Sequence, residues 1–227
     1  YIIGFANILI EPLIDIHSEY VLLTLFVTFT TIITFIDECG DDAVDASVKS
    51  NSKTIDAISD LPKDKKADYF QTAKSHDGLT SAINNSNNPK EAVSFVAEHG
   101  DDGGFVVIKY GDNAVQAASK CTTPEITADA VQLMKDNTKN TVEAINKYGD
   151  DAVKSLNNVS KSYQSKCSKY IVDYGDDAIE SLGRYGNEAN NAVSKCSDAY
   201  KKDAFSLMNS ENGMAVRYIK RNGDTGV

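Results

Sequence analysis

The feature that most constrains this chain is a glycine that returns at a nearly constant distance along the sequence. The register glycines are Gly40, Gly78, Gly111, Gly149, Gly186 and Gly223. Their successive separations are 38, 33, 38, 37 and 37 residues, which is a period of about 37. Periods of this length are typical of stacked helical hairpins. The sequence therefore predicts a helical repeat array over residues 40–227.

The residues around these glycines predict how one helix ends and the next begins. YGDDAV occurs at 148–153 and YGDDAI at 174–179. Glycine ends a helix in the left-handed conformation at little steric cost, and an Asp directly after it can accept hydrogen bonds from the free amides of a new helix. The second Asp lies in the first turn of the new helix, where the helix dipole stabilises a negative charge. Ala-Val then starts an apolar stripe, and the preceding Tyr is expected to pack over the junction.

Extra copies of the motif divide each repeat. Gly100 and Gly175 each lie eleven residues before a register glycine. This spacing predicts a short helix of about eight or nine residues and a long helix of about 24 to 26 residues, intact or broken. Pro124, directly after Thr123, predicts a kink or a break in one of the long helices.

Composition supports an all-α fold of stacked helical hairpins and excludes one class of partner. Hydrophobic residues make up 41% of the chain, aromatic residues 8%, and there is no Trp and only 4 Pro. Sandwiches and barrels built from many short strands usually contain more turn-forming and aromatic residues. The net charge of -10 argues against a nucleic-acid partner, because phosphate binding requires clustered Lys and Arg.

The first 39 residues form a segment of a different kind. Residues 1–48 contain no Lys or Arg, and positions 20–36 (YVLLTLFVTFTTIITFI) carry no charge. A helix of this length spans about 25 Å, slightly less than the hydrocarbon core of a bilayer, which is about 30 Å thick. Two interpretations stay open: a membrane span at 20–36, or a helix buried on every side in a soluble or oligomeric assembly.

Candidate metal ligands and catalytic carboxylates come from four pairs of acidic residues. The pairs are Asp41-Asp42, Asp101-Asp102, Asp150-Asp151 and Asp176-Asp177. A calcium loop requires oxygens at alternating positions that close on a distant Glu, and no stretch of the sequence supplies them. We interpret the pairs as helix-capping residues.

Cysteine and histidine spacings also favour structural roles. Cys121 and Cys196 both fall ten residues after a register glycine, so we expect them two repeats apart, on the order of 20 Å. This is too far for a disulfide, and we expect Cys39, Cys121, Cys167 and Cys196 to be free thiols. His17, His76 and His99 lie far apart in the sequence. The sequence therefore predicts no catalytic, cofactor-binding or metal-binding residue and no small-molecule substrate.

The segments KYGDDAVKSL and DYGDDAIESLGRYGNEA resemble the Tyr-Gly-Asp-x-Ala-Val helical repeats found as spacers in large prokaryotic secreted toxins and surface proteins. More broadly, they resemble α-solenoid hairpin repeats. The resemblance covers residues 100–227, extends loosely over 40–100 and leaves out 1–39. It implies a stacked helical architecture and no catalytic residue. A toxin of this type is expected to carry its active domain beyond Val227.

Three hypotheses for the function follow. The first is a non-enzymatic structural or protein-interaction module, membrane-associated through residues 20–36, at the cell surface or secreted, whose concave face binds a protein partner. The second is a spacer or translocation region of a secreted toxin-like effector. The third is an integral subunit of a larger membrane complex.

Overall fold

The computed structural model describes residues 30, 33–211 and 213–227. Every regular element among these residues is a helix, so the all-α prediction is confirmed. Residues 33–39 are helical. The elements that follow are α3 (Asp41–Lys49), α4 (Ser52–Ser59), α5 (Lys63–Ser75), α6 (Leu79–Asn84), α7 (Pro89–Tyr110), α8 (Asp112–Ala118), α9 (Pro124–Asp136), α10 (Lys139–Asn157), α11 (Lys161–Tyr174), α12 (Asp176–Tyr185), α13 (Asn187–Val193), α14 (Lys201–Ser210), α15 (Gly213–Asn222) and η2 (Gly223–Gly226).

The membrane prediction for 20–36 lies mostly outside the described residues. Among the residues that the structure does describe, no helix is both long enough and apolar enough to cross a bilayer.

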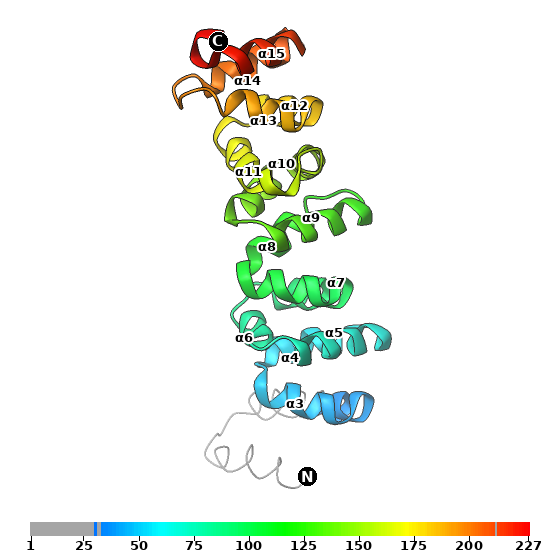
Figure 1. Cartoon of the computed structure of the whole chain (residues 1–227). Helices are drawn as coiled ribbons and strands as arrows, with labels where there is room; N and C mark the ends of the chain where they lie inside the picture. The colour runs from blue at the N-terminus through cyan, green and yellow to red at the C-terminus, as the bar shows by residue number, and fades with distance from the viewer. Residues whose placement is uncertain (1–29, 31–32, 212) are drawn as a thin grey trace.

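The helices stack in units that follow one another along a single axis, from the blue end to the red end of Figure 1. Each unit has a first helix, a second helix and a short third helix. Unit 1 is α4, α5 and α6, unit 2 is the two halves of α7 and then α8, unit 3 is α9 and the two halves of α10, unit 4 is α11, α12 and α13, and unit 5 is α14, α15 and η2. Neighbouring units contact one another, as α10 contacts α8 and α12.

The segment predicted to form a long helix is broken between units. The break at Thr123-Pro124 is confirmed, because α8 ends at Ala118 and α9 begins at Pro124. The Thr123 hydroxyl caps the new helix by accepting from the Ile126 amide. Loops at 158–160 and 194–200 interrupt the equivalent segments without any proline. Each repeat therefore contains three helices.

The register glycines join the second helix to the third without a linker. In Gly111, Gly149 and Gly186 φ is 51 to 58° and ψ is -124 to -140°. The predicted left-handed helical conformation is wrong for these glycines: φ is positive, but ψ lies in the mirror image of the extended region, which glycine also populates. The Gly111 amide donates to Val107 O and its carbonyl accepts from the Ala114 amide. One residue thus ends one helix and starts the next.

The core is a continuous row of small and branched apolar side chains inside the stack. Alanine stands three residues after several register glycines and is fully buried there, at Ala43, Ala114, Ala152 and Ala189. Four residues before a register glycine the side chain is a buried branched one, at Val107, Ile145, Leu182 and Ile219. The small alanines let the short third helices lie close to their neighbours.

Candidate functional site

A tetrapeptide at the end of the second helix in units 2 to 5 makes many of the polar contacts between units. It reads KYGD at 109–112 and at 147–150, RYGN at 184–187 and RNGD at 221–224. We call these the linking tetrapeptides.

In units 2 and 4 the first two residues of the linking tetrapeptide bind the following unit. Lys109 Nζ and the Tyr110 hydroxyl donate to the Asn137 carbonyl at 3.1 and 2.9 Å. In unit 4, Arg184 donates to Asn209 O at 3.5 Å. These carbonyls lie at the carboxyl end of a first helix, where unpaired C=O groups and the helix dipole attract a cation. Lys109 also lies over the tyrosine ring, with Nζ 5.0 Å from its centroid.

The last residue of a linking tetrapeptide binds the loop of the preceding unit. Asp112 accepts from the Asn87 amide at 2.9 Å and from the Ser86 hydroxyl. Asp150 accepts from the Thr122 amide at 2.9 Å and from its hydroxyl. Equivalent bonds join Asn187 to Ser160 and Asp224 to Ser197. The prediction that this residue caps its own helix is wrong, because the glycine occupies the N-cap position and the side chain reaches back to the earlier loop.

The glycine of a linking tetrapeptide lies against the same loop. A Cβ added at Gly186 would lie 2.4 Å from Asn158 O, and one at Gly149 would lie 2.7 Å from Lys120 O. At Gly111 an added Cβ would meet nothing within 4 Å. The requirement for glycine is therefore both conformational and steric in units 3 and 4, and only conformational in unit 2.

Ionisation of Asp112 is linked to the stability of the stack. Burial raises the pKa of the Asp112 carboxyl, but hydrogen bonds from Ser86 and Asn87 outweigh burial, and the pKa lies below its ordinary value. A carboxyl whose pKa is lower in the folded state than in the unfolded chain stabilises the fold above the unfolded pKa of about 3.9. That contribution disappears as the pH falls through the folded pKa.

We expect Asp112→Ala to lower the free energy of unfolding by about 1 kcal/mol at pH 7, a small value because the carboxyl is partly exposed. Urea denaturation from pH 7 to pH 3 should show the difference from wild type shrinking below about pH 4. Asp151→Ala is the matched control, since Asp151 is exposed, and we expect a change within about 0.5 kcal/mol. Equal effects of the two substitutions would contradict the linking role of Asp112.

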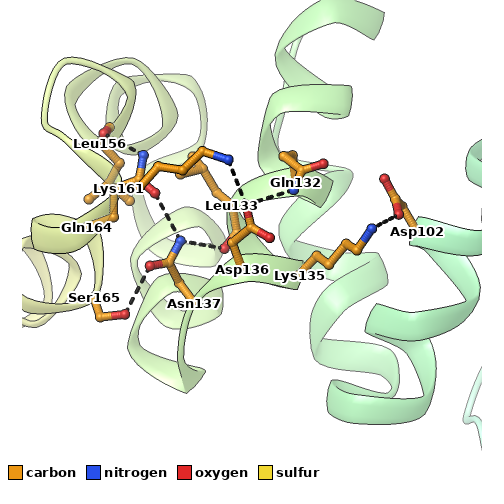
Figure 2. A network of polar contacts seen from close by, with 10 residues as sticks. All are labelled: Asp102, Gln132, Leu133, Lys135, Asp136, Asn137, Leu156, Lys161, Gln164 and Ser165. Atoms are coloured by element: carbon orange, nitrogen blue, oxygen red, sulfur yellow. Dashed lines mark hydrogen bonds and ion pairs between the residues drawn. The ribbon is translucent and has the colours of Figure 1, made fainter.

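Asn137 is the centre of a buried polar network between units 2, 3 and 4 (Figure 2). Its side-chain amide donates to Leu133 O at 2.9 Å and to Gln164 Oε1 at 3.2 Å. Its side-chain oxygen accepts from the Ser165 hydroxyl at 2.9 Å, and Gln164 donates in turn to Leu156 O at 3.2 Å. A satisfied buried network of this kind favours one register of the neighbouring helices over others.

Charged residues border this network on both sides in Figure 2. Lys161 Nζ lies 3.3 Å from Asp136 Oδ2, which also accepts from Gln132 at 2.8 Å. On the other side Lys135 donates to Asp102 of unit 2. Lys135, Asp136 and Asn137 are consecutive in the sequence, so the end of α9 and its C-cap residue contact the units before and after it.

The paired acidic residues are distributed among ion pairs, loops and helix starts. Asp42 pairs with Lys74 at 2.5 Å, Asp102 with Lys135, and Asp150 binds the loop at Thr122. Asp176 and Asp177 lie in the first turn of α12. Within the described part of the chain, no three His, Cys, Asp or Glu side chains are grouped closely enough to hold a metal ion.

The four cysteines are free thiols. Cys167 and Cys196 are buried, and Cys39 and Cys121 are half-buried. Burial raises the pKa of Cys167 to about 12 and that of Cys121 to about 11. These thiols are protonated at neutral pH and are poor nucleophiles.

The two described histidines, His76 and His99, contact side chains of the helical stack. His76 Nε2 lies 3.4 Å from Asp101 Oδ1, and the His99 ring packs against Phe95 with centroids 4.7 Å apart. Burial lowers the pKa of His99, so its imidazole is neutral at pH 7. His17 lies outside the described residues.

The outer face of the second helices carries an apolar patch in unit 2 and mainly charged or polar residues in units 3 to 5. Phe105 and Ile108, on the second half of α7, are 38% and 40% exposed. Counted from the register glycines, the equivalent positions hold Glu143 and Asn146 in unit 3, Glu180 and Gly183 in unit 4, and Arg217 and Lys220 in unit 5. We call Phe105 and Ile108 the outer patch.

A groove of about 580 Å³ lies beside the outer patch, between units 2 and 3, and Lys109, Tyr110, Lys139, Val142 and Glu143 are among the residues that line it. Lys109 connects the groove to the patch, because its Nζ lies 5.5 Å from the centre of the Phe105 ring. Patch and groove together offer apolar and aromatic surface, and the amine of Lys139 beside them has no ion-pair partner among the residues that the structure describes.

Comparison of the chain with protein-family models, with characterised proteins and with solved structures found no match.

A second periodic signal in the sequence could have revealed the bonds between units. Each Asp or Asn that ends a linking tetrapeptide follows its Ser or Thr loop partner at a separation of 26 to 28 residues. The partners are Ser86, Thr122, Ser160 and Ser197. No comparable signal marks the outer patch, because the sequence alone does not show which side of the apolar run FVVI at 105–108 faces outward.

Proposed function

We propose that this chain is a non-enzymatic protein-interaction module of the α-solenoid type, in which the stack holds a binding surface formed by the outer patch and the adjoining groove. The observation that carries the proposal is the pair of exposed apolar side chains, Phe105 and Ile108, at positions that are charged or polar in units 3 and 5. Exposed aromatic and aliphatic side chains beside a groove are typical of protein contact sites.

The chemistry of the surface indicates the kind of partner. Phe105 and Ile108 suit an apolar side chain, and Lys139 suits a carboxylate. Lys109 already donates to Asn137 O, so it contributes mainly its aliphatic stem and its place over the Phe105 ring. We therefore propose a partner segment that presents an acidic residue next to an apolar one.

The test is affinity capture from an extract of the source cells, followed by crosslinking with a carbodiimide that joins a lysine amine directly to a carboxylate. We expect a captured protein whose crosslink maps to Lys139, and we expect Phe105→Ser with Ile108→Ser to weaken capture by about tenfold or more. The double variant should keep the helical circular dichroism spectrum of the wild type, because both side chains are exposed.

The matched control is Glu180→Ser with Gly183→Ser, which changes the equivalent exposed positions of unit 4. Capture by this variant should equal capture by the wild type. The proposed site is wrong if the control and the outer-patch variant lose the same proteins, or if the crosslinks map away from Lys139.

The apolar segment 20–36 would attach the module either to a membrane or to an assembly. Co-flotation of the chain with phospholipid vesicles, resistant to a carbonate wash, is the result expected of a membrane span. Recovery of the chain at the bottom of the gradient in a defined oligomer is the result expected of a buried helix.

A further inference from the structure

A cavity of about 490 Å³ lies at the start of the stack, lined by residues of α3, α5 and α6 and of the turn between α5 and α6. Its volume is within the range of cavities that hold small molecules in proteins. It shares no lining residue with the groove beside the outer patch. The residues that line it include Ala46, Ser50, Tyr69, Phe70, Ala73 and Thr80.

Buried polar groups without a hydrogen-bond partner gather around this cavity. Most buried polar side chains in a folded protein are hydrogen-bonded. In the described part of the chain seven buried side-chain atoms are not, and six of them belong to residues between Ser47 and His76. Of the three that come from lining residues, His76 Nε2 lies 3.4 Å from Asp101 Oδ1. The hydroxyls of Ser50 and Tyr69 are left for a ligand.

Tyr69 is the more deeply buried of these two residues, with a side chain that is 1% exposed. Burial raises the pKa of its phenol to about 12, so the phenol keeps its proton at neutral pH, and the nearby Thr80 side chain opposes that shift. Thr80 also lines the cavity, which places the hydroxyl end of Tyr69 at this wall. The two hydroxyls nevertheless do not form a hydrogen bond. Burying an unpaired hydroxyl destabilises the fold, and a ligand that pairs with it would recover the lost hydrogen bond.

The charges around the cavity indicate an uncharged ligand. Asp42 lies 2.5 Å from Lys74, and Asp45 lies 3.5 Å from Lys49, so these four lining residues pair with one another. The fifth charged residue of the wall, Asp77, is exposed to solvent. A charged group that entered the cavity would lose its hydration without gaining an unpaired opposite charge, which is unfavourable.

The two free hydroxyls and the apolar part of the wall indicate the chemical class of the ligand. A hydroxyl both donates and accepts hydrogen bonds, and the ligand groups that match it best are hydroxyls. Ala46, Phe70 and Ala73 offer apolar surface beside them. A sugar ring or a cyclic polyol combines hydroxyl groups around its edge with C–H groups on its faces.

We propose that this cavity binds a small uncharged sugar or polyol, whose hydroxyl groups form hydrogen bonds with Tyr69 and Ser50. Hydrogen bonds and packing alone would hold the ligand, which is compatible with a non-enzymatic module. The site is separate from the outer patch, so the Phe105→Ser, Ile108→Ser variant should bind the ligand like the wild type.

The test is saturation-transfer NMR of the chain with glucose, galactose, mannose, N-acetylglucosamine and myo-inositol, followed by titration of each probe that binds. We expect at least one of them to bind. Tyr69→Phe removes only the hydroxyl and should weaken that binding by about tenfold, the value of one hydrogen bond. Its melting temperature should be no lower than that of the wild type, because the hydroxyl has no partner among the described residues. Ser50→Ala should also weaken binding.

The matched control is Tyr170→Phe. Tyr170, in α11, is 5% exposed, its hydroxyl is also buried without a partner, and it does not line the cavity. This variant should melt no lower than the wild type and bind the probe with unchanged affinity. The pair of variants therefore separates the loss of a buried hydroxyl from the loss of a ligand contact.

Three results would overturn the proposal. In the first, no uncharged probe binds at millimolar concentration, which would mean that water alone pairs with the buried hydroxyls. In the second, Tyr69→Phe binds the probe as tightly as Tyr170→Phe does. In the third, the anionic sugar glucuronate binds more tightly than glucose, which would contradict the assignment of an uncharged ligand.

Discussion

Replacing Gly186 by alanine is expected to lower the free energy of unfolding by about 4 kcal/mol or more. The backbone at Gly186 has φ 51°, a conformation that costs alanine about 1 to 3 kcal/mol. In addition, the new Cβ would lie 2.4 Å from Asn158 O. That oxygen belongs to the loop of the preceding unit, which must move away and lose its bond from Ser160 to Asn187.

Gly111→Ala separates the conformational cost from the steric cost. Gly111 has nearly the same φ, 58°, but an added Cβ meets nothing within 4 Å. We expect this variant to lose only about 1 to 3 kcal/mol. Urea denaturation followed by circular dichroism measures both variants. Equal losses would show that the close approach of Gly186 to the preceding loop contributes nothing to stability.

Replacing Asn137 by alanine is expected to cost about 2 to 4 kcal/mol, because it leaves buried polar groups of two units without partners. Gln164 Oε1 loses its donor and the Ser165 hydroxyl loses its acceptor. Asn137→Gly should be at least as harmful. The φ of Asn137 is -121°, so glycine offers no conformational relief at this position.

The matched control for Asn137 is Asn140→Ala. Asn140 is half-buried, and its side chain makes no hydrogen bond within the described part of the chain. We expect a change within about 0.5 kcal/mol for this variant in the same denaturation experiment. An effect of Asn137→Ala no larger than that of the control would contradict a stabilising role for the network in Figure 2.

Local rules predicted the places where helices end. Glycine tolerates positive φ far better than residues with a Cβ, and Gly111, Gly149 and Gly186 all end a second helix as expected. The same rules gave the wrong ψ for these glycines, and they wrongly predicted that the following Asp caps its own helix. Whether Asp112 caps its own helix or binds Ser86 depends on where a loop 26 residues earlier lies, and that distance is not a local property.

The breaks in the predicted long helix also have two kinds of cause, a local one and a contact between units. Pro124 predicts its break because proline clashes with the preceding turn. The loop at 158–160 contains no proline, and the chain turns there because the Asn187 oxygen binds the Ser160 amide and hydroxyl. A contact made by the following unit stabilises this turn, which the local sequence does not predict.

The sequence by itself determined the helical class, the period and the position of each glycine hinge, because these depend on backbone preferences and on the spacing of apolar residues along one helix. Only the tertiary structure decided which unit each linking residue contacts, and which apolar side chains, Phe105, Ile108, Met214 and Tyr218, stay exposed. The exposure of a side chain depends on which residues pack around it. In the stack, residues that are nearly thirty positions apart in the chain lie next to one another.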